Sequence, residues 1–219
     1  MSAEIRDIAI FTTLAALAAT AVMLVPGVAV AWLLARRQFP GKSIVETLVS
    51  LPLVMPPVAT GLMLLWLFSR RGPIGGLLAR LGIDIVFTPA AVVIAMAVMG
   101  LPLLVRTARA GFEQVTRRYE QIAETLGAGP WRVFSTVTLP LAARNILAGA
   151  TLGFSRALGE FGATIVVAGS IPGRTRTLAV GIYSFTENGQ DRQAAMLLAI
   201  SVSIAFVAVL ASNRLAKEA

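Results

Sequence analysis

The chain contains neither cysteine nor histidine among its 219 residues. The missing cysteines exclude a disulfide framework and a thiolate metal site. The missing histidines exclude imidazole both as a general base and as a metal ligand. We expect a protein with no cofactor, no bound metal and no catalytic residues.

Charged residues are scarce as well, at 14% of the chain against 57% hydrophobic residues. The mean hydropathy of +0.80 is not that of a soluble domain. The net charge of +8 would point to nucleic acid in a soluble chain, but here the basic residues must first be placed against a membrane. The expected fold class is an all-α polytopic membrane protein whose partner is the lipid bilayer, with no nucleic acid.

Long uncharged stretches supply the candidate transmembrane spans. Four of them reach the roughly 20 residues that a span requires, and they cover residues 8–35, 47–69, 85–105 and 194–213. Residues 141–169 form a fifth candidate, interrupted by Arg144, Arg156 and Glu160. The first stretch is too long for a cleaved signal and its strong positive charges follow it, so it is expected to be retained. The sequence thus predicts one transmembrane domain over residues 1–219 with five spans.

The distribution of basic residues predicts how the spans are oriented. Two connections on one side of a five-span arrangement hold Arg36, Arg37, Lys42, Arg106, Arg109, Arg117, Arg118 and Arg132. Because cytoplasmic loops are rich in lysine and arginine, we expect the N-terminus outside and the C-terminus in the cytoplasm. Residues 178–185 are too short to cross, and we expect them to dip in or pack at the interface. The alternative, a sixth span there, would move the C-terminus outside.

Prolines interrupt the second candidate span at Pro52, Pro56 and Pro57. Each lacks a backbone donor, so we expect this helix to bend or break. The carbonyl groups freed in this way must face protein or a water-filled cavity. Either a kinked helix beside a pore or a kink satisfied by packing alone fits this pattern. In the connection over residues 70–89, a short apolar patch predicts a surface helix.

A polar interruption over residues 112–140 separates two apolar segments. Apolar residues recur there at steps of three and four, which predicts an amphipathic helix from about residue 112 to 126; they are Phe112, Val115, Tyr119, Ile122 and Leu126. Gly127 and Gly129 provide a stop, Pro130 suits the start of a second short helix, and Pro140 opens the next span. Such an amphipathic segment in so apolar a chain indicates a docking surface.

This segment resembles the EAA loop of ABC importer permeases. That loop begins with a trio of residues, has a glycine after three more residues, and ends nine residues later in aliphatic-x-Leu-Pro. In this chain the trio is Gln121-Ile122-Ala123, in which Gln121 and Ile122 depart from the Glu-Ala consensus. Gly127, Leu139 and Pro140 stand at the expected spacing. The alternative is an ordinary connection between spans. The resemblance implies contact with a cytoplasmic ATPase, with these coupling residues: Gln121, Ile122, Ala123, Glu124, Leu126, Gly127, Trp131, Phe134, Leu139 and Pro140.

Two charges, Arg156 and Glu160, lie within the candidate span over residues 141–169, which is the fourth in chain order. Four residues apart, they share a helix face and can pair, and both are costly in hydrocarbon unless they face the bundle interior. One interpretation is a structural salt bridge. The other is a translocation pathway in which Arg156 supplies positive potential to an anion and Glu160 tunes or gates it. The expected pathway or gate residues are Arg156, Glu160, Gly162 and Thr164.

The run from Arg156 to Thr164 also carries a more specific resemblance. With Pro172-Gly173-x-Thr175-x-Thr177 after it, and Phe39-Pro40-Gly41-Lys42 before it, the chain is similar to the molybdate, tungstate and sulfate importer permeases. The resemblance implies the fold of type I ABC importer permeases in the cell membrane of a prokaryote. It also implies a homodimer that carries two cytoplasmic ABC ATPase subunits and receives the oxyanion from an external binding protein.

The chain has no Gly-x-x-x-x-Gly-Lys-Ser/Thr phosphate loop, so ATP is expected to be bound by a partner. Under the resemblance, the chain is the permease that carries molybdate inward, with sulfate or tungstate as alternatives that the external binding protein would decide. An ion-coupled secondary transporter using Glu160 as the proton carrier is a further alternative. A simple membrane anchor would leave the charged pair without a purpose.

Overall fold

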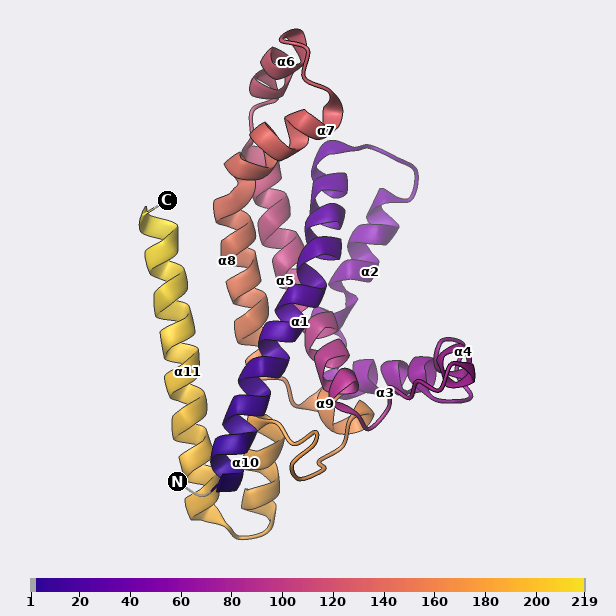
Figure 1. Cartoon of the computed structure of the whole chain (residues 1–219), viewed down its shortest axis with the longest axis vertical. Coiled ribbons are helices and arrows are strands. Elements are labelled where there is room, and N and C mark those ends of the chain that lie inside the picture. Colours follow the sequence, from indigo (N-terminus) through magenta and orange to yellow (C-terminus); the bar gives the residue numbers. More distant parts are fainter. Residues whose placement is uncertain (1–2, 219) are drawn as a thin grey trace.

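The computed structural model describes the backbone of residues 3–218 and the side chains of residues 3–210. All regular secondary structure in this part of the chain is helical, without a strand. The helices form an elongated bundle (Figure 1). Helices α6 and α7 stand at one end, called here the loop end, and α10 stands at the other, called the far end.

Three long helices form the centre of the bundle: α1 (Ala3–Arg36), α5 (Pro89–Gln114) and α8 (Leu139–Leu158). Small residues bring α5 and α8 into backbone contact, since a Cβ added at Gly100 would lie 2.9 Å from the carbonyl oxygen of Gly153. Close approach through glycine is the usual way in which membrane helices gain packing energy. The core around them is made largely of alanine, with methionine and leucine.

The second expected span is broken, as its prolines predict. Helix α2 (Lys42–Val54) ends before Pro56, α3 (Pro57–Phe68) begins directly after it, and the two differ in direction by 116°. The adjacent prolines lack the N–H groups that would continue the helix. Four other helical stretches of the described chain are long and apolar enough to cross a membrane, and the bent pair would be the fifth.

The fourth expected span also differs from a single helix over residues 141–169. Helix α8 ends at Leu158, and a separate short helix, α9 (Gly162–Val167), lies against α3. Contact there is close, because a Cβ at Gly61 would lie 2.8 Å from the Cα of Ala163. Figure 1 shows α3 and α9 running across the long axis of the bundle.

An arm leaves the bundle at the end of α3. It carries α4 (Gly75–Arg80), the short surface helix that the sequence predicts. Arg70 holds the arm together through hydrogen bonds of 2.8 and 2.6 Å to Asp84. These hydrogen bonds lower the pKa of the Asp84 carboxyl below its usual value.

The far end is closed by α10 (Leu178–Glu187), which packs against the first part of α11 (Asp191–Glu218). Its ten residues are too few to cross a bilayer, in keeping with an interfacial helix. The Oγ1 of Thr12 on α1 accepts a hydrogen bond of 2.8 Å from the N–H of Leu178. Helix α11 then runs back toward the loop end, so the ends of the described chain point to opposite ends of the bundle (Figure 1).

Candidate functional site

The polar interruption forms a helical elbow at the loop end. Its first part differs from the expected helix over residues 112–126, because α5 ends at Gln114 and α6 (Arg117–Thr125) begins after an extended link. Val115 in that link is buried in the core and does not share the stripe of α6. Val115 and Thr116 are both β-branched, which disfavours helix and favours extended backbone.

The turn of the elbow is set by Gly127, whose φ is +84°. Its N–H donates to the carbonyl of Glu124 at 2.9 Å, and the N–H of Ala128 donates to that of Ala123 at 3.0 Å. This pair of hydrogen bonds is the Schellman ending of a helix, which favours glycine in the left-handed position. After it, α7 (Pro130–Val133) begins with proline in its first turn, as expected.

Large apolar side chains project from the elbow. Leu126 is 83% exposed and Trp131 is 78% exposed, with Tyr119 and Ile122 exposed beside them on α6. These four residues form a surface that we call the elbow face. Exposed apolar patches of this kind mark contact with another protein or with lipid. Among the expected coupling residues, the structure also exposes Gln121, Glu124, Gly127 and Pro140.

Of the three expected docking side chains Leu126, Trp131 and Phe134, Phe134 is the one that packs against the bundle. Its ring centroid is 5.5 Å from that of Trp32 on α1, in edge-to-face contact, and 6.4 Å from that of Phe112 on α5. Leu139 also packs against the same core, and Ala123 is half-buried. Phe134 therefore fixes α7 to the bundle, while Trp131 remains outside.

The elbow passes into α8 without interruption. A π-helix, η1 (Phe134–Thr138), follows α7 directly and is followed directly by α8. Pro140 explains the wider turns, because its ring would clash with the carbonyl four residues earlier in a regular α-helix. The sequence predicts a separate helix at Pro140, whereas the structure joins the elbow to the membrane helix as one body.

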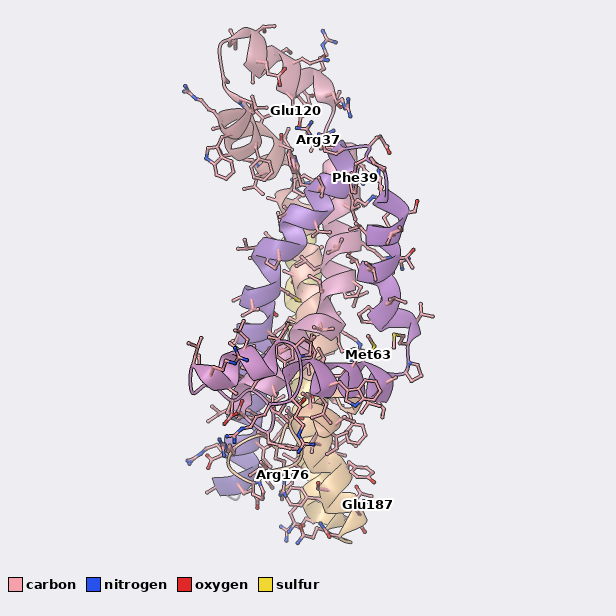
Figure 2. All side chains as sticks on the ribbon, turned by 90° about the vertical axis from the view of Figure 1, so that its right-hand side faces the viewer. Arg37, Phe39, Met63, Glu120, Arg176 and Glu187 are labelled. Carbon is pink, nitrogen blue, oxygen red and sulfur yellow. The ribbon has the colours of Figure 1, made fainter. Side chains whose placement is uncertain are left out.

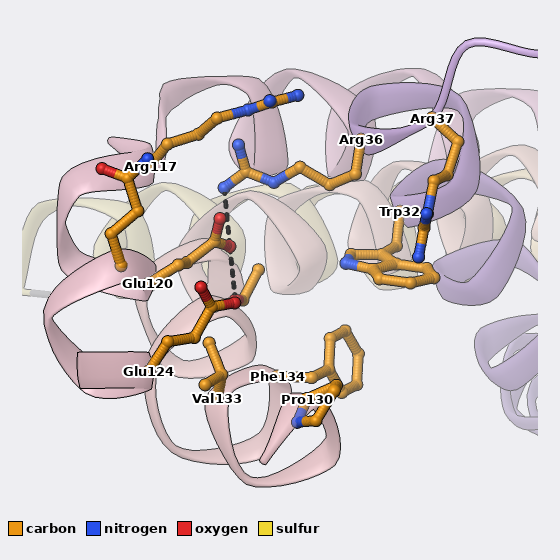
Figure 3. A pocket seen from close by; sticks show the side chains of 11 residues that line it. Trp32, Arg36, Arg37, Arg117, Glu120, Glu124, Pro130, Val133 and Phe134 are labelled. Carbon is orange, nitrogen blue, oxygen red and sulfur yellow. Dashed lines mark hydrogen bonds and ion pairs between the residues drawn. The ribbon is translucent and has the colours of Figure 1, made fainter. Parts of the chain in front are cut away.

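An ion pair that the sequence does not predict anchors the elbow to α1. Arg36 Nη2 lies 3.0 Å from Glu120 Oε1, and the same carboxylate oxygen accepts a 2.6 Å hydrogen bond from Thr138 (Figure 3). Arg36 also donates to the carbonyl oxygen of Val115 at 2.9 Å. A groove of about 330 Å³ opens beside this network. Arg36 ends an uncharged span and Glu120 precedes the Gln121 trio, but nothing in the spacing pairs residues so far apart.

The second expected site lies between α8 and α9. Arg156 Nη1 is 2.7 Å from Glu160 Oε2, so the predicted pair exists, with the Glu160 side chain 1% exposed and that of Arg156 27% exposed. Glu160 follows the end of α8 instead of lying on its face. Its Oε1 accepts a 2.7 Å hydrogen bond from the N–H of Ala163, which caps α9. The carboxylate is therefore shared between the ion pair and the helix start.

Gly162 and Thr164 lie in the same region and are buried. Gly162 packs on α3, since a Cβ there would lie 2.7 Å from Cβ of Pro57. The hydroxyls of Thr60, Ser155 and Thr164 have no hydrogen-bond partner among the described residues. The four expected pathway residues are thus neighbours in one polar region around the start of α9.

A family model described as the binding-protein-dependent transport system inner membrane component matches residues 27–215. The chain belongs to this family. It is 46% identical over 193 residues to the molybdenum transport system permease protein ModB of Escherichia coli K12, covering 87% of this chain and 84% of that protein. The sulfate transport system permease protein CysT of the same strain is 37% identical over 184 residues, covering 82% of this chain and 66% of that protein. The predicted resemblance is confirmed, and the chain is a multi-pass inner membrane protein.

Solved structures confirm the fold class. The inward-facing MetNI methionine ABC transporter matches with a TM-score of 0.71 at 15% identity, covering 100% of this chain and 99% of that chain. A bacterial alginate ABC transporter in complex with its alginate pentasaccharide-bound periplasmic protein matches with a TM-score of 0.73 at 16% identity, covering 100% and 80%. At such low identity the likeness establishes the type I importer permease fold alone.

Proposed function

We propose that this chain is the membrane-spanning subunit of an ATP-driven importer that carries molybdate, or a related tetrahedral oxyanion, into the cell. The observation that carries the proposal is the elbow, which presents Leu126 and Trp131 to solvent and continues as one helix into α8. A surface of this kind can receive force from a partner and pass it to a membrane helix. The ModB relatives give the substrate class.

In this proposal ATP is hydrolysed by a separate ABC ATPase, and two copies of that subunit bind a dimer of this chain. A two-fold dimer offers the same elbow face to each ATPase subunit. Native mass spectrometry of the complex measures the copy numbers. A stable complex with only one copy of this chain would contradict the dimer.

The orientation places the N-terminus outside, with the elbow and the C-terminus in the cytoplasm. Arg37 and Glu120 lie at the loop end and Arg176 and Glu187 at the far end (Figure 2). The loop end also holds Arg36, Lys42, Arg117 and Arg118, so the preference of basic loops for the cytoplasm supports this assignment. The far end would then receive the external binding protein.

Within the bundle we assign Arg156 to the anion pathway. Its side chain is partly exposed whereas that of Glu160 is buried, so of the two charged residues Arg156 is the one that an anion could reach. Glu160 is committed to α9 and to the ion pair, which favours a holding role for it over a gate. Gly162 and Thr164 support this site as the packed start of α9.

The test is uptake by the reconstituted system. The chain and its ATPase are reconstituted in proteoliposomes with the ATPase facing the lumen, and a binding protein is added outside. Uptake of labelled molybdate into the vesicles is then measured with and without ATP enclosed in the lumen. We expect uptake only with ATP and with the binding protein present. Competition by tungstate and sulfate ranks the anions, since CysT relatives favour sulfate as the second candidate. Uptake driven by a proton gradient without the ATPase would instead identify a secondary transporter.

A further inference from the structure

Arg36 joins helix α1 to three other segments at the loop end. Its Nη2 donates to the carbonyl of Val115 in the link between α5 and α6, and to Glu120 on α6. Glu120 in turn accepts a hydrogen bond from Thr138 in η1. One guanidinium thus ties α1 to the link, to α6 and to the start of α8.

This junction is sheltered from solvent. The side chains of Arg36 and Glu120 are 11% and 18% exposed, and Trp32 and Phe134 pack edge to face beside them. Exposed ion pairs contribute about 0 to 1 kcal/mol, but partial burial lowers the effective dielectric and strengthens the attraction. Both hydrogen bonds come from Nη2, whose two N–H groups are held in fixed directions by the planar guanidinium, whereas the ammonium of a lysine rotates freely.

Helix α1 is tied at its other end too. Thr12 accepts a hydrogen bond from the N–H of Leu178, and Glu4 forms an ion pair of 3.0 Å with Arg176. From Thr12 to Arg36 the helix extends about 36 Å at 1.5 Å per residue. It is therefore a continuous connection between the elbow and the start of α10.

We propose that Arg36 is a positioning residue that transmits movement of the elbow to α1, and through α1 to the segment before α10 at the far end. This rests on the proposed function, because it requires an ATPase docked on the elbow face. Without the junction, the extended link at Val115 and Thr116 would let α6 move relative to the bundle. Helix α8 would still follow the elbow directly, whereas α1 would be joined to it only by apolar packing such as that of Trp32 against Phe134.

The experiment compares the amount of molybdate taken up per ATP hydrolysed by the full complex in proteoliposomes. The test variant is Arg36→Met with Glu120→Gln, which removes both charges and leaves neither buried without a partner. The matched control is Arg37→Met, which removes a charge from the next residue, exposed and without an ion pair within residues 3–210. Arg36→Lys keeps the charge but loses the planar guanidinium that directs both N–H groups of Nη2.

We expect both variants and the control to copurify with wild-type amounts of ATPase and to hydrolyse ATP. Uptake per ATP should fall about tenfold in the double variant, a typical size for coupling between sites. It should fall less in Arg36→Lys and remain unchanged in Arg37→Met. A merely structural role for the pair would lower the amount of assembled complex without changing this ratio.

A double variant whose ratio lies within about twofold of the Arg37→Met ratio overturns the inference, because that is the scatter of independent sites. If the double variant does not assemble, Arg36→Lys decides, and an unchanged ratio there overturns the inference equally. Failure of the wild-type chain to bind any ATPase would instead refute the proposed function. The two failures are therefore distinguishable.

Discussion

At the scale of single residues, Glu160 shows why an intramembrane charge can have two explanations at once. One carboxylate oxygen caps α9 through the N–H of Ala163, and the other faces Arg156. A buried carboxylate without these partners would be strongly disfavoured in the bilayer. Removing Arg156 alone therefore measures the cost of leaving Glu160 buried and unpaired as much as the loss of any contact with an anion.

A double substitution separates these two roles. Arg156→Met alone should destabilise the fold by about 3 to 5 kcal/mol, because Glu160 is left buried and unpaired. Arg156→Met with Glu160→Gln removes that penalty, and the glutamine carbonyl can still accept from Ala163. We expect assembly of the complex to recover while molybdate uptake stays at least about tenfold below wild type. Uptake that recovers together with assembly would leave only the salt-bridge role.

The elbow face should behave as a small set of anchors. Trp131→Ala and Leu126→Ala each remove a large exposed apolar side chain, and central aromatic anchors cost about 2 to 4 kcal/mol when truncated. We expect either change to reduce the ATPase that copurifies with the chain, with little effect on the amount of folded chain. Leu77→Ala on α4, exposed to a similar degree at 62%, is the matched control. Equal loss in all three variants would argue against docking at the elbow.

At the scale of helices, the helix boundaries set by proline and glycine could be predicted from the sequence, whereas those set by tertiary contacts could not. Pro56 and Pro57 predict the break between α2 and α3, and Gly127 predicts the turn of the elbow. The periodic pattern over residues 112–126 fails because tertiary packing buries Val115 in an extended link. The separate start of α9 is capped by Glu160, which spacing alone does not reveal.

The crossing of α3 and α9 provides a prediction at this scale. Gly61→Val should push the two helices apart, since even a Cβ would lie 2.8 Å from backbone atoms of Ala163. Overpacking of this kind costs about 1 to 3 kcal/mol. Gly159→Ala is the control, because a Cβ there meets no atom within 4 Å. We expect thermal unfolding in detergent at a lower temperature for Gly61→Val only, and equal unfolding temperatures would contradict the close contact.

At the scale of the whole molecule, the sequence predicts which connections share an end of the bundle better than it predicts the course of the membrane helices. The two basic connections that the sequence prediction groups together lie at the same end, as Arg37 and Glu120 show, and the start of α1 lies at the other end with Arg176 (Figure 2). Which end faces the cytoplasm remains a prediction. The prolines predict that the second span bends or breaks, but neither the angle of 116° between α2 and α3 nor the packing of α9 against α3 could be predicted, because both depend on contacts between segments far apart in the chain. The link from Arg36 to Glu120 could not be predicted either, since it joins residues 84 positions apart.

The missing cysteines make the orientation directly testable, because a single introduced cysteine has no background. Thr125→Cys places a thiol at the end of α6, and Asn188→Cys places one after α10; both positions are exposed. With the N-terminus outside, a membrane-impermeant maleimide added to intact cells should label Asn188→Cys, and it should label Thr125→Cys only after the membrane is permeabilised. The unmodified chain is the control and should take no label. The reverse pattern would place the elbow outside, where no cytoplasmic ATPase could reach Trp131. Labelling of both positions in intact cells would also contradict the prediction, because it would require one end of the bundle to follow a re-entrant path. The predicted pattern would instead put the elbow face and the ATPase on the same side of the membrane.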